Sequence, residues 1–144
     1  MILGAACVLL LLAGCAKSER PVLQNLNGQE NFSLFRIQSM RGTRDGDRLD
    51  TRVMISDSSS ILTMDMHFAV GSPTRLESGT WRWSRSGHEM SGSVMARSVT
   101  FLGGQDGPPS VGGTFDLTGD NGAPLYRVTL PVAELQRLNA QLQP

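Results

Sequence analysis

Methionine and histidine are the residues of this chain whose types and spacing could support a specific chemistry. Two methionines lie in the segment 64–66 (MDM), and a histidine and a methionine lie in the segment 88–90 (HEM). Side chains two positions apart on a β-strand share a face, so Met64 and Met66 could bind one ion together. Thioether sulfur and imidazole nitrogen suit soft ions such as Cu(I). The candidate ligands for a soft metal are Met64, Met66, His88 and Met90.

The methionine pair also carries a resemblance to a known family. The segment 64–70 (MDMHFAV) resembles the M-x-M-x-F-x-V stretch of small β-barrel periplasmic copper chaperones, and this resemblance implies a Cu(I)-binding protein. It covers this one segment of the chain. The sequence departs from that family elsewhere, because Ile61 occupies the place of a tryptophan and Val53 lies where those chaperones carry an upstream histidine.

The alternative for the same methionines is a place in the hydrophobic core, and it is the one we favour. Across residues 60–69, apolar side chains that include both methionines alternate with more polar ones, as in a strand with one buried face. Methionine is flexible and fills irregular space in a core. Trp81 and Trp83 also share a strand face. Exposed, they would form a stacking platform for a glycan, and buried, they would be the largest core residues, which we favour.

No catalytic motif accompanies these residues. The sequence contains neither G-x-S-x-G nor H-E-x-x-H nor a P-loop, and no local motif joins its histidines to a serine nucleophile. Positive and negative side chains balance at 13 each, which argues against the basic surface of a nucleic-acid-binding domain. We therefore expect a protein without enzymatic activity and without a nucleic-acid partner.

The N-terminal residues have the pattern of an export signal. No charged side chain occurs from Ile2 to Gly14, and the apolar run is shorter than the stretch of about 20 residues that a membrane-spanning helix needs. The motif Leu12-Ala13-Gly14-Cys15 resembles the lipobox of bacterial lipoproteins. The resemblance implies cleavage just before Cys15, a diacylglyceryl group on its thiol and acylation of the new amino terminus.

The same resemblance implies an address in the cell envelope. Each buried methylene group contributes roughly 0.8 kcal/mol, so two or three acyl chains hold a protein firmly on a membrane. Ala16 follows the cysteine, whereas an aspartate there would suggest retention in the inner membrane. We therefore expect a lipid-anchored protein on the periplasmic face of the outer membrane. Its expected partner is an envelope protein, and it needs no cofactor beyond the covalent lipid.

Behind the signal, the sequence predicts a tether and one domain. Residues 1–14 form the signal peptide, residues 15–31 the lipidated N-terminus with a polar, flexible tether, and residues 32–144 a β-domain. No disulfide is expected in the domain, because Cys7 leaves with the signal and Cys15 carries the lipid.

The domain has the two-residue periodicity of β-strands. From Phe32 onward, apolar and polar residues alternate, and turn pairs such as Asp45-Gly46 and Asn121-Gly122 separate the alternating segments. The expected strands cover residues 32–41, 48–56, 60–69, 75–84, 88–95, 97–102, 112–118 and 124–130. This pattern predicts an all-β fold, which is a single antiparallel β-sandwich or small barrel of about eight strands.

The C-terminal segment predicts a short helix. Pro131 suits the first helical turn, where its missing N–H has no partner to lose. The apolar residues that follow it recur at helical spacing, so their shared face should pack against the sheet. These residues are Val132, Leu135, Leu138 and Leu142.

A loop rich in glycine and proline is the last candidate site. Residues 103–113 (GGQDGPPSVGG) lie between two predicted strands, and such a loop at the rim of a β-domain could contact a partner. The candidate contact residues are Gln105, Asp106, Pro108 and Pro109. A plain connection between strands is the alternative and the one we favour.

Overall fold

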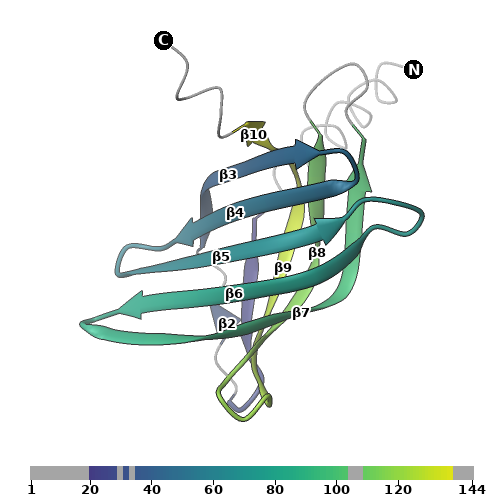
Figure 1. The fold of residues 1–144 in the computed structure, drawn as a ribbon. Coiled ribbons are helices and arrows are strands. Elements are labelled where there is room, and N and C mark those ends of the chain that lie inside the picture. Colours follow the sequence, from purple (N-terminus) through teal and green to yellow (C-terminus); the bar gives the residue numbers. More distant parts are fainter. Residues whose placement is uncertain (1–19, 29–30, 33–34, 104–108, 138–144) are drawn as a thin grey trace, which may run out of the picture.

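The computed structural model describes residues 20–28, 31–32, 35–103 and 109–137, and this part of the chain is all-β without a helix (Figure 1). The strands are β1 (Val22–Asn25), β2 (Asn31–Phe32), β3 (Arg36–Asp45), β4 (Arg48–Ser56), β5 (Ser60–Ala69), β6 (Arg75–Arg85), β7 (His88–Leu102), β8 (Ser110–Thr118), β9 (Pro124–Glu134) and β10 (Gln136–Arg137).

These strands form one sheet in the order β10-β3-β4-β5-β6-β7-β8-β9-β1-β2. Neighbours pair antiparallel throughout, except that β10 runs parallel to β3. The sheet curls into a half-barrel, in which the arm β3–β6 crosses over the arm formed by β8, β9 and β1 (Figure 1). Strand β7 belongs to both arms, because its first part pairs with β6 and its second part pairs with β8. The expected all-β, antiparallel class is confirmed, and its form is this single curled sheet.

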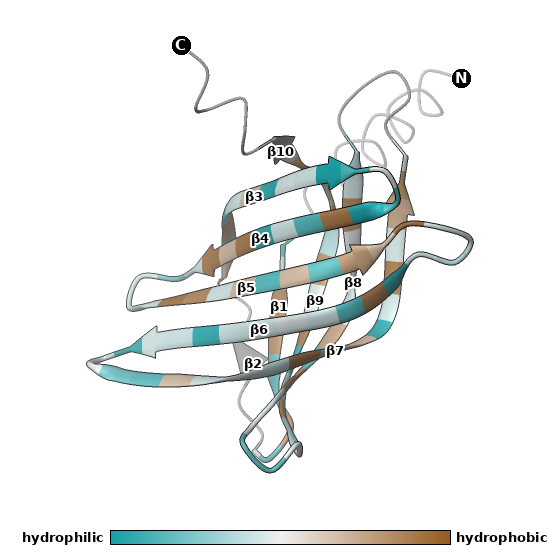
Figure 2. Cartoon of the chain, in the orientation of Figure 1, coloured by the Kyte–Doolittle hydropathy of each residue, from teal (hydrophilic) through white to brown (hydrophobic). Residues whose placement is uncertain are grey.

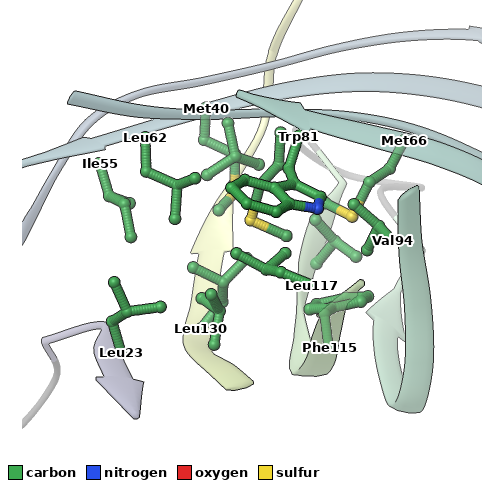
Figure 3. Packing of buried hydrophobic residues seen from close by; sticks show 14 of the residues in the cluster. Leu23, Met40, Ile55, Leu62, Met66, Trp81, Val94, Phe115, Leu117 and Leu130 are labelled. Carbon is green, nitrogen blue, oxygen red and sulfur yellow. The ribbon is translucent and has the colours of Figure 1, made fainter. Parts of the chain in front are cut away.

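The hydrophobic core fills the space between the two arms. Leu62 and Ile55 reach into it from one arm, and Leu23 and Leu130 reach toward them from the other (Figure 3). Hydrophobic and hydrophilic residues alternate along the strands (Figure 2), and in β4 and β5 the apolar positions of this alternation are the buried ones. The core residues are Leu23, Phe35, Met40, Leu49, Val53, Ile55, Leu62, Met64, Met66, Phe68, Trp81, Trp83, Val94, Val111, Phe115, Leu117, Val128, Leu130 and Leu135.

Strand β7 joins two segments that the sequence separates. Residues 88–95 and 97–102 belong to one continuous strand, with a β-bulge between them. Ala96 pairs with Phe115 and Ser98 pairs with Thr114, so Arg97 is the extra residue of the bulge. A bulge shifts the phase of the alternation by one residue, which explains why the sequence pattern breaks at this point.

The predicted C-terminal helix is wrong for the described residues. Residues 131–134 continue β9, and residues 136–137 form β10; residues 138–144 lie outside the described part of the chain. Pro131 lies in a second bulge, because β8 pairs first with Leu130 and then with Ala133. Proline is tolerated there, where the ladder needs no N–H. Leu135 is buried against Gly42 of β3, so pairing in the sheet outweighs the helical spacing.

Part of the predicted tether also belongs to the sheet. Val22 to Asn25 pair with β9 from Thr129 to Tyr126, and Leu23 is fully buried. The sheet therefore includes residues ahead of Phe32, where the sequence predicts the start of the β-domain. A single buried leucine in a polar segment gives no periodicity, so this strand depends on its pairing with β9.

Candidate functional site

The four candidate metal ligands do not meet at one point. Met64 and Met66 are 0% exposed and point into the core from β5. His88 and Met90 lie at the exposed start of β7, on the far side of β6 from β5. Among the described residues, no group of three or more histidine, cysteine, aspartate or glutamate side chains could hold a metal ion.

The two tryptophans are core residues. Trp81 and Trp83 are almost fully buried, and both rings pack edge-to-face against Tyr126 of β9. The indole N–H of Trp81 donates a hydrogen bond of 2.9 Å to the carbonyl oxygen of Thr118. The preferred interpretation of the sequence is confirmed here, because neither ring presents an exposed stacking surface.

Two further candidate sites lie largely outside the described residues. They are Cys15 and the loop residues Gln105, Asp106 and Pro108. Pro109 is described, and its carbonyl oxygen accepts a hydrogen bond of 2.8 Å from the backbone N–H of Leu135. This bond ties the end of the loop to the segment between β9 and β10, which is a structural role.

The outer face of the β4–β6 arm carries charges that are already paired. Arg52 donates to Asp65 at 2.7 Å, and His67 donates to Asp50 at 2.6 Å. The hydrogen bond from His67 lowers the pKa of Asp50 and outweighs burial, which acts in the opposite direction. A shallow hollow of about 710 Å³ lies above the Arg52–Asp65 pair. Because its charged walls satisfy one another, this hollow offers little to an incoming ligand.

A different hollow opens where β6 and β7 part. The two strands pair only from Thr80–Ser93 to Arg85–His88. Beyond that point, residues 75–79 of β6 pair with β5 alone, and residues 94–102 of β7 pair with β8 alone. The diverging strands enclose a hollow of about 460 Å³, lined by residues 74–77 and 94–99. We call this hollow the wedge.

Two β-bulges hold the wedge open. On β6, His67 pairs with Ser78 and Phe68 pairs with Leu76, so Glu77 is an extra residue. On β7, Arg97 is the extra residue of the bulge described above. A bulge bends its strand and increases its twist. Because one lies on each side of the wedge, the two strands turn apart instead of continuing their ladder.

The wedge has an apolar floor and a charged rim. Leu76 and Val99 are partly buried against the core, and Val94 is buried at the apex. Met95 is 57% exposed beside them. The rim carries both signs of charge, and its charged residues are Arg75 and Glu77 on β6 and Arg97 on β7.

Beside the wedge, an ion-pair network joins Arg97 of β7 to β8 and β9. The Asp116 carboxylate accepts hydrogen bonds from Arg127 at 2.8 Å and from Arg97 at 2.9 Å. Burial raises the pKa of Asp116, but the hydrogen bonds from Arg127 and Arg97 outweigh this effect and leave the pKa below its usual value. The network therefore fixes the position of Arg97, a rim residue, from the neighbouring strand.

Sequence reasoning did not find the wedge. Its residues carry no motif, and the bulges that form it depend on the register between separate strands. The one signal was the break in alternation near Ala96, which marks the bulge at Arg97.

Comparison with known proteins identifies no relative of this chain. No protein-family model, no curated protein and no solved structure matches this chain. In the described residues, no helix has the length and apolar character needed to cross a membrane.

Proposed function

We propose that this protein is a lipid-anchored, non-enzymatic binding module on the periplasmic face of the outer membrane. The wedge is the observation that supports a binding role. It combines an apolar floor and a charged rim with two strand edges that pair with no other strand on the side facing the wedge. The lipobox at Cys15 supports the anchor. The partner expected from this location is another envelope protein.

The short link between anchor and domain supports a role close to the membrane. The first strand begins at Val22, and the chain from Cys15 to Val22 can span at most about 25 Å when fully extended. A domain on such a link remains near the membrane surface. Binding would therefore hold the partner at the outer membrane.

Replacing Cys15 with alanine should remove the protein from the outer membrane. Without the thiol there is no lipid to anchor it there. Fractionation of cells should then show the loss of almost all of the protein from the outer-membrane fraction. Cys7→Ala is the matched control and should leave the protein in the outer membrane. Retention of the Cys15→Ala protein in the outer-membrane fraction would refute the anchor.

A photo-crosslinking residue placed at Met95 should capture the partner in intact cells. Met95 is exposed at the wedge, whereas Ile61, which is 44% exposed on β5, provides a control away from it. We expect one dominant adduct from position 95, containing an envelope protein identified by mass spectrometry, and no such adduct from position 61. Equal adducts from both positions, or none from either, would refute binding at the wedge.

A further inference from the structure

We infer that the wedge binds an extended strand of the partner, which adds to the sheet between β6 and β7 and carries net negative charge. This inference rests on the proposed function and identifies the kind of partner segment. Three observations support it: the unpaired backbone edges of β6 and β7, the two bulges that keep these strands apart, and the apolar and charged side chains around the wedge.

The backbone edges select an extended chain. A strand in a sheet normally pairs on both sides, but residues 75–79 of β6 and residues 94–99 of β7 each have one neighbour. Backbone N–H and C=O groups along such an edge pair readily with an added strand. The edge on β6 is about five residues long, which corresponds to roughly 17 Å of extended chain.

The geometry at the apex of the wedge keeps β6 and β7 from pairing with each other along its two edges. At the apex, a Cβ atom on Gly79 would lie 3.0 Å from the Cβ of Val94, so the two strands touch there. The bulges at Glu77 and Arg97 then bend the strands apart. The opening is therefore built into the register of the sheet.

The side chains around the wedge define an alternating sequence for the bound strand. Successive residues of a strand point to opposite faces. Its inward residues would meet the apolar floor formed by Leu76, Val94 and Val99, so they should be apolar. Its outward residues would lie between the rim charges, so they should be polar.

The charge around the wedge favours an acidic strand. The lining of the wedge carries two positive side chains, Arg75 and Arg97, and one negative side chain, Glu77. The adjoining network on β8 and β9 adds Asp116 and Arg127, whose charges cancel. The Asp116 carboxylate is already paired with two arginines. The β6 edge carries Glu77 and Arg75, neither of which forms an ion pair with another described residue, and Arg75 is the cation of this edge. An acidic residue in an outward position would complement it.

Labelled synthetic peptides test the inference on the mature lipidated protein in detergent micelles. The probe has about eight residues and alternates valine with threonine and glutamate. One comparison peptide has the same composition with its valines in one block, and another replaces each glutamate with lysine. We expect the alternating acidic peptide to bind at least tenfold more tightly than either comparison peptide.

Two substitutions on β6 test whether the peptide binds at the wedge or elsewhere along the strand. Arg75→Gln should weaken binding of the acidic peptide several-fold. Arg82→Gln is the matched control, because Arg82 lies on the same strand but pairs with Glu89 outside the wedge, and it should leave the affinity unchanged. Equal effects of the two substitutions would overturn the inference.

Amide hydrogen exchange locates the bound strand. In the free protein, about half of the amides in residues 75–79 and 94–99 should exchange quickly, since alternate N–H groups point to the open side. The peptide should protect these amides and leave β4 unchanged. Protection in the free protein, or peptide-induced protection elsewhere, would overturn the inference. Protection that rises with protein concentration alone would assign the wedge to a second copy and also overturn it.

The experiments can refute the proposed binding role and the inference of a bound strand independently of each other. If the peptides do not bind but the crosslink from position 95 persists, the strand inference falls and the proposed binding role remains. If the crosslink is also absent, the proposed binding role falls with it.

Discussion

Replacing Gly92 with alanine should destabilise the domain by about 2 to 4 kcal/mol. Gly92 lies on β7 directly opposite Trp81 of β6, and the indole reaches across β7 to the carbonyl of Thr118. A Cβ atom on residue 92 would collide with that carbonyl oxygen and lie 2.7 Å from the indole nitrogen. The added methyl group would therefore overpack the core and displace a buried hydrogen bond.

Gly71→Ala is the matched control for this substitution. A Cβ atom on Gly71 meets nothing closer than the carbonyl oxygen of Pro73 at 3.6 Å, which is an ordinary contact. Urea unfolding should show a large loss of stability for Gly92→Ala and a change within about 0.5 kcal/mol for Gly71→Ala. The indole N–H resonance of Trp81 should also shift in Gly92→Ala. Similar stability of the two variants would contradict this account of the packing.

The central strands could be predicted from the sequence because their signals are local. β4 and β5 have the bounds that alternation and turn residues indicate, and β6 extends one residue further. In β4 and β5, one face is buried along its length, so apolar and polar residues alternate without interruption. Met64 and Met66 illustrate the same point, since their two-residue spacing places both on the buried face of β5.

The elements that could not be predicted depend on pairing between distant segments. The sequence near Pro131 has helical spacing, but its structure follows from a bulge opposite Gly112 and from the burial of Leu135 against Gly42. Strand β1 likewise exists through its pairing with β9. Local sequence patterns give no information on such contacts, because the residues that form them lie far apart in the chain.

The wedge could not be predicted for the same reason. Its shape comes from two bulges, and each bulge is defined by the residues that face it on another strand. The candidate sites in the sequence were residues with distinctive chemistry, such as tryptophan and methionine, and the fold buries many of these residues in its core. The wedge is lined instead by ordinary residues such as Leu76 and Arg97, whose importance lies in where the sheet opens.

Replacing Asp116 with asparagine should destabilise the domain by about 2 to 3 kcal/mol at pH 7. The side chain of Asp116 is 8% exposed and accepts hydrogen bonds from both Arg97 and Arg127. Asparagine has no charge and one carbonyl oxygen, so it cannot satisfy both guanidinium groups. Urea unfolding at pH 7 measures the loss. Asp120→Asn, an exposed position in the turn after β8, is the control and should change stability by less than about 0.5 kcal/mol.

The difference between wild type and Asp116→Asn should depend on pH in one direction. Because the pKa of Asp116 is lowered in the folded protein, its carboxylate stabilises the fold at pH values above the unfolded-state pKa of about 3.9. That stabilisation is lost as the pH falls through the folded-state pKa, since the protonated group no longer forms the two ion pairs. Unfolding measured from pH 7 to pH 2 should therefore show a constant difference down to about pH 5 and a shrinking one below pH 4. A difference that stays constant through this range would show that the carboxylate's charge does not stabilise the fold, and that Arg97 at the rim of the wedge is held by other contacts.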